Sequence, residues 1–71
     1  MTDTIDRRAD VAGDALKLFQ GLTGSDDTDA LGDLLSDLMH LCDRTDAYGD
    51  FNEGLRLARM HYRDETNLKG N

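Results

Sequence analysis

Hydrophobic residues recur at helical spacing in three stretches of the chain, which two short glycine-containing segments separate. When successive residues are placed 100° apart, five apolar residues of the first stretch fall on one stripe. They are Ile5, Ala9, Ala12, Leu16 and Phe19. Val11, Ala15 and Leu18 widen this stripe, so that roughly half of the circumference is apolar. The pattern predicts a helix over about residues 3–20, ended by the glycines that follow.

The second stretch has the clearest periodicity. One face carries Leu31, Leu34, Leu35, Leu38, Leu41 and Cys42, and the opposite face carries Asp29, Asp33, Asp37, His40 and Arg44. The segment from Ser25 to Asp29 is typical of a helix start, because hydroxyl and carboxylate oxygens cap free backbone N–H groups. We expect a helix over about residues 28–44.

The third stretch opens with the spacing of a capping box. Asp50 is the expected cap, and Glu53 is expected to reach back to the cap residue. The apolar stripe that follows consists of Phe51, Leu55, Ala58 and Tyr62. We expect a helix over about residues 51–65, followed by a frayed tail over residues 66–71.

The fold class predicted from these stretches is all-α, with three short amphipathic helices in one small domain, residues 1–71. The short connection over residues 45–49 favours an antiparallel hairpin of the second and third helices. A chain of this size buries only about 60% of its unfolded surface on folding. Its core is therefore thin, and dimerisation is one way to complete it.

The net charge is -7, and it is concentrated in the middle of the chain. Residues 21–50 carry eight acidic residues against Arg44 alone, while the flanking segments are nearly neutral. Phosphates need cations, so direct nucleic-acid binding is disfavoured and a protein partner with a basic surface is favoured. The bias towards aspartate is equally compatible with a GC-rich genome or a high-salt cytoplasm.

Four aspartates spaced three or four residues apart define what we call the acidic ridge: Asp26, Asp29, Asp33 and Asp37. One hypothesis is that the ridge binds a basic groove of another protein. A narrower form of this hypothesis is that the ridge imitates a nucleic-acid backbone. The alternative is a solvated face, partly paired with the arginine stripe of the third helix within the hairpin or across a dimer. That stripe consists of Arg56, Arg59 and Arg63.

The helices carry more apolar surface than one core stripe each can use. Val11 and Leu18 widen the stripe of the first helix, and Leu57 and Met60 project away from the stripe of the third. We predict that these four residues form an apolar contact surface for a homodimer or for docking on another protein. The alternative is scattered exposed hydrophobic residues, which are normal in proteins.

Motifs for catalysis are absent from the sequence: it has no phosphate-binding glycine loop, no paired cysteines and no serine elbow. We therefore expect no enzyme and no cofactor, and we expect Cys42 to act as a small buried hydrophobic residue. A distant alternative is a metal-dependent enzyme. Its ligands would be Asp37, His40, His61 and Asp64, each pair spaced to present two ligands from one side of its helix.

The expected location is the cytoplasm. No apolar run exceeds three residues, so the sequence predicts neither a membrane span nor the core of a signal peptide. The single cysteine suits a reducing compartment.

The segment from Leu31 to Glu65 resembles a loose class of short helical proteins encoded by phages, plasmids and integrated elements. The likeness lies in Leu34-Leu35-Ser36-Asp37-Leu38-Met39-His40, in Phe51-Asn52-Glu53, and in Leu55, Ala58, His61 and Tyr62. The resemblance implies origin in a mobile element. Small acidic proteins of that origin often bind and block a host protein, so it favours an inhibitor or adaptor. The main alternative is a structural or assembly subunit whose entire role is helix association.

Overall fold

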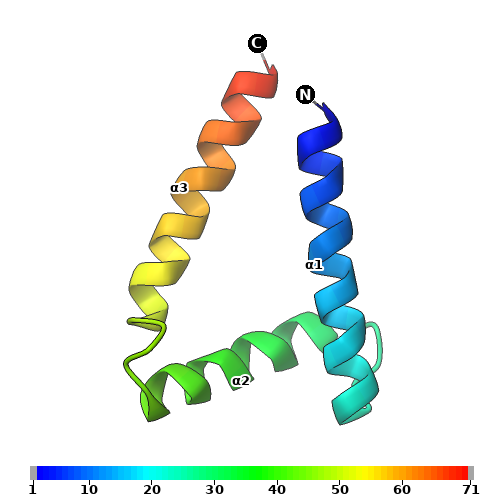
Figure 1. Ribbon diagram of the computed structural model, residues 1–71, viewed down its shortest axis with the longest axis vertical. Helices are drawn as coiled ribbons and strands as arrows, with labels where there is room; N and C mark the ends of the chain where they lie inside the picture. The colour runs from blue at the N-terminus through cyan, green and yellow to red at the C-terminus, as the bar shows by residue number, and fades with distance from the viewer. Residues whose placement is uncertain (1, 71) are drawn as a thin grey trace. The chain divides into compact units, whose positions relative to one another are not determined.

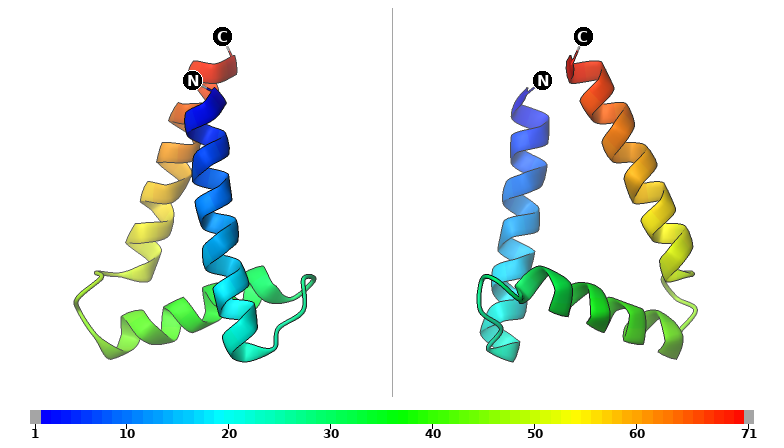
Figure 2. Two further views of the ribbon diagram at one scale, coloured as in Figure 1. Left: turned by 45° about the vertical axis from the view of Figure 1, so that its right-hand side comes forward. Right: turned by 180° about the vertical axis from the view of Figure 1, so that it is seen from behind.

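The computed structural model describes the backbone of residues 2–70 and the side chains of residues 4–67. Within these residues the chain forms three α-helices and no strand (Figure 1). They are α1 (Thr2–Thr23), α2 (Ala30–Arg44) and α3 (Phe51–Gly70), and each is unbroken when seen from further sides (Figure 2). The predicted all-α, three-helix fold is confirmed.

The chain divides into two compact units, Met1–Asp37 and Leu38–Asn71. The first unit contains α1, the loop after it and the start of α2, while the second contains the rest of α2 and α3. Because the boundary falls inside α2, the antiparallel pairing of α2 with α3 stays a prediction. The single domain and its completion by dimerisation also stay predictions.

The C-terminus of α1 lies at Thr23, three residues beyond the predicted end at residue 20. Gly21 is helical, whereas Gly24 adopts a left-handed conformation, with a φ of 81°. The N–H of Gly24 donates to the carbonyl of Gln20 at 2.8 Å. A glycine inside a helix costs only about 1 kcal/mol relative to alanine, so Gly21 does not end α1. Gly24 does, because its φ turns the chain away from the helix.

The start of α2 is a capped turn. The Asp26 carboxylate accepts a hydrogen bond from the N–H of Asp29 at 3.0 Å, and the Asp26 carbonyl accepts one from Ala30 at 2.9 Å. The predicted helix start between Ser25 and Asp29 is therefore a cap, and the regular helix begins at Ala30. The predicted end at Arg44 is confirmed.

The start of α3 repeats this arrangement. The Asp50 carboxylate accepts a hydrogen bond from the N–H of Glu53 at 2.9 Å, which confirms Asp50 as the cap. The return contact predicted for Glu53 was wrong. Its carboxylate accepts two hydrogen bonds from Arg56, at 3.0 and 2.7 Å. A bidentate pair between two charged groups is stronger than a single bond to a backbone N–H.

The helix α3 extends past its predicted end at residue 65 and continues to Gly70, while the predicted fraying of the tail stays a prediction. The hydroxyl of Thr66 donates to the carbonyls of Tyr62 and Arg63, at 2.9 and 3.0 Å. Its polar group is thus satisfied within the helix, and each further helical residue adds a backbone hydrogen bond. Residue 71 lies outside the described residues.

The core is very small. Among the described side chains only Ala30 is buried. Apart from Met60, the half-buried apolar residues belong to the predicted stripes: Ile5, Leu16 and Phe19 on α1, Leu34, Leu41 and Cys42 on α2, and Phe51 and Leu55 on α3. Ala58 and Tyr62, also expected on the α3 stripe, are exposed. The stripes are therefore only partly covered.

Candidate functional site

All four aspartates of the acidic ridge are exposed and lie in the first unit. Two of them have local roles: Asp26 caps α2, and Asp33 accepts a hydrogen bond from the Ser25 hydroxyl at 2.5 Å. The carboxylates of Asp29 and Asp37 make no hydrogen bond or ion pair with any described residue. The carboxylates of Asp29 and Asp37 are therefore available to a partner, whereas those of Asp26 and Asp33 already accept local hydrogen bonds.

Side chains at the end of α1 fix the loop that carries the start of the ridge. The Gln20 amide donates to the Asp27 carboxylate at 2.8 Å and to the Ser25 carbonyl at 3.3 Å. The hydroxyl of Thr23 donates to the Phe19 carbonyl at 2.8 Å and accepts from the Ser25 N–H at 3.3 Å. The loop is thus tied to the last turn of α1.

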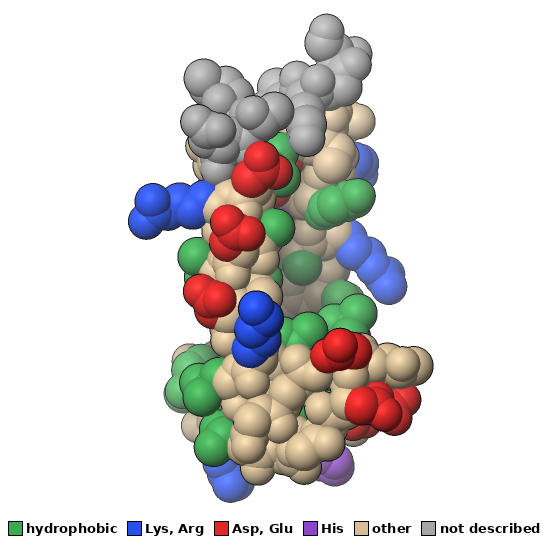
Figure 3. All heavy atoms as spheres, turned by 90° about the vertical axis from the view of Figure 1, so that its right-hand side faces the viewer, with side chains coloured by type: hydrophobic (Ala, Val, Ile, Leu, Met, Phe, Trp, Pro, Cys, Tyr) green, Lys and Arg blue, Asp and Glu red, His purple; other side chains and the backbone are tan. Residues whose placement is uncertain are grey.

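Negative charge is concentrated in the first unit. That unit has nine acidic and three basic residues, a balance of -6, and the second has six and five, a balance of -1. The first unit also has a row of exposed aspartates on α1, at Asp6, Asp10 and Asp14. Figure 3 shows acidic side chains following one another along α1, with hydrophobic side chains on either side. Substitution of this row changes the net charge as much as substitution of three ridge aspartates, so the row can serve as a control for the ridge.

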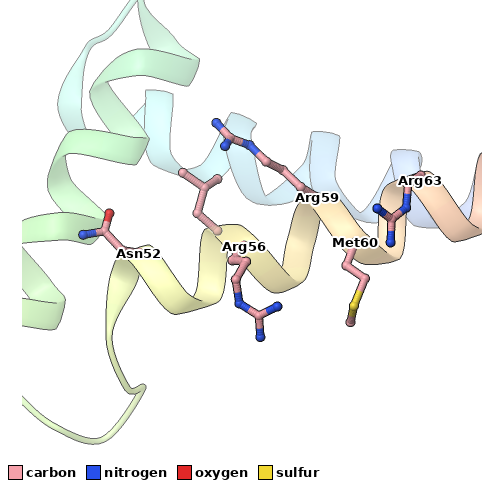
Figure 4. A pocket seen from close by; sticks show the side chains of 6 residues that line it. Asn52, Arg56, Arg59, Met60 and Arg63 are labelled. Carbon is pink, nitrogen blue, oxygen red and sulfur yellow. The ribbon is translucent and has the colours of Figure 1, made fainter.

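The arginine stripe lines an open hollow of about 580 Å³ on α3. Its lining residues are Asn52, Leu55, Arg56, Arg59, Met60 and Arg63. Figure 4 shows these side chains projecting from a single helix, with Arg59 and Met60 extending from opposite sides of it. Because one helix supplies every lining residue, the hollow is an open surface and encloses no ligand cavity.

Acidic residues of α3 pair with part of the arginine stripe. The two hydrogen bonds between Arg56 and Glu53 raise the pKa of Arg56 and lower the pKa of Glu53. The Nε of Arg63 lies 3.7 Å from the Asp64 carboxylate, a weaker contact. Arg59 has no ion pair with any described side chain. The predicted pairing between this stripe and the acidic ridge stays a prediction.

The predicted apolar contact surface is exposed at three of its four residues. Val11 is 60% exposed, Leu18 66% and Leu57 36%, while Met60 is half-buried beside the arginine stripe. Leu22, at 78%, is the most exposed large hydrophobic residue among those described. Leu22 was not among the predicted contact residues, because the predicted helix ended at residue 20.

Neither unit gathers three or more His, Cys, Asp or Glu side chains in a metal-binding arrangement among the described residues. His40 and His61 are exposed. Cys42 is a half-buried free thiol on the apolar face of α2, so it is less covered than expected. The metal-dependent alternative therefore gains no geometric support within either unit.

Comparisons with known proteins give no information about the function of the chain. No family model, curated protein or solved structure matches the chain. The resemblance of residues 31–65 to proteins of mobile elements therefore stays a prediction. Over the described residues, no helix combines the length and the apolar character that crossing a membrane requires.

Proposed function

We propose that the chain is a non-enzymatic protein-binding module that places exposed helix faces against other protein chains. The observation that carries this proposal is the distribution of apolar surface. Ten large hydrophobic side chains are exposed among the described residues, whereas only Ala30 is buried. Covering apolar surface is favourable by about 25 cal/mol per Å². Exposed apolar residues that share one helix face, such as Val11 and Leu18 on α1, are candidate interaction sites.

The acidic ridge supplies the chemistry that selects the partner. Asp29 and Asp37 present exposed carboxylates with no partner among the described residues. Opposite charge on a partner would speed the encounter and fix its orientation, and salt would screen the attraction. The proposed partner is a protein with a basic surface. The resemblance supports a role as an inhibitor or adaptor of a host protein, encoded by a mobile element.

Imitation of a nucleic-acid backbone is the narrower form of this proposal. Carboxylates four residues apart on a helix rise by about 6 Å, whereas one DNA strand carries a phosphate every ~3.4 Å. The α2 part of the ridge, Asp33 and Asp37, therefore has about half the linear charge density of one strand. This spacing favours a basic protein surface in general over a groove built for a duplex.

The test is affinity capture from a lysate of the source organism, quantified by mass spectrometry. The ridge variant combines Asp29→Asn, Asp33→Asn and Asp37→Asn. The matched control combines Asp6→Asn, Asp10→Asn and Asp14→Asn, which changes the net charge equally. We expect the ridge variant to lose a protein that the wild type and the control retain, with capture weakening as salt rises.

Equal retention or equal loss in the two variants would contradict a role for the ridge. Release of the captured protein by added duplex DNA would support the nucleic-acid mimic.

A homo-oligomeric structural subunit is the second candidate, and the exposed apolar stripe of α1 favours it. Self-assembly that is insensitive to salt, together with no ridge-dependent capture, would support this candidate over the inhibitor or adaptor.

A further inference from the structure

We draw no further inference here: the strongest candidate, the exposed apolar face of α1 at Val11, Leu18 and Leu22, carries nothing beyond the proposed function, because nothing among the described residues shows what covers it.

Discussion

The carboxylate of Asp26 accepts a hydrogen bond from the backbone N–H of Asp29 at 3.0 Å. Asp50 caps α3 through the N–H of Glu53 in the same way, at 2.9 Å. Each cap satisfies an N–H that has no partner inside its helix. Both carboxylates also lie next to the N-terminus of a helix, where the helix dipole favours negative charge. Part of the acidity of this chain therefore defines where its helices begin.

Removal of either cap should destabilise the fold. We expect Asp26→Ala and Asp50→Ala each to lower the free energy of unfolding by about 1 kcal/mol. Urea unfolding at one fixed chain concentration measures this, because association would make stability depend on concentration. Asp43→Ala is the control, since Asp43 is exposed and its side chain bonds to no described residue. Equal losses in all three variants would show that charge, and not capping, is responsible.

Two glycines three residues apart should respond oppositely to the same substitution. A Cβ at Gly21 or at Gly24 would meet nothing within 4 Å, so only the backbone conformation differs. Gly24→Ala should lower the free energy of unfolding by about 1 kcal/mol, because its φ is 81°. Gly21→Ala should raise it by about 1 kcal/mol, because Gly21 is helical. Thermal or urea unfolding measures both, and a change of the same sign in both variants would contradict the assigned helix end.

The pair formed by Glu53 and Arg56 should make α3 sensitive to acid. The hydrogen bonds from Arg56 lower the pKa of Glu53 below its ordinary value of 4.5. A lowered carboxyl pKa stabilises the fold above the ordinary value, and this stabilisation is lost as the pH falls through the lowered pKa. NMR titration should give a Glu53 pKa that returns towards the ordinary value in Arg56→Gln. An unchanged pKa in that variant would show that the pair does not persist in solution.

The helical periods of the chain were sufficient to predict three helices and the faces that become half-buried. The end of α1 was not predictable from composition, because Gly21 and Gly24 look alike in the sequence. What distinguishes them is a backbone torsion, stabilised by the hydrogen bonds that Gln20 and Thr23 make around the loop. The misplaced end of the helix therefore concealed Leu22, an exposed residue of α1.

The sequence was sufficient to predict which aspartates form the acidic ridge. It was not sufficient to predict which of their carboxylates are free of local hydrogen bonds. Periodicity shows which residues share a face, whereas local geometry decides which carboxylates are already engaged. Asp26 serves as a cap and Asp33 is bonded to Ser25, so the contacts of a loop determine what remains. Glu53 shows the same competition, because Arg56 offers its carboxylate a better partner than the backbone does.

The central claim is that other protein chains cover the exposed apolar residues of α1 when the protein works. Carbene footprinting with mass spectrometry measures this cover residue by residue. When a protein captured in the ridge-dependent assay is added at rising concentration, labelling of Val11, Leu18 and Leu22 should fall together, while labelling of Tyr48 stays constant. Labelling of these three residues that stays as high as that of Tyr48 at every concentration would contradict the claim.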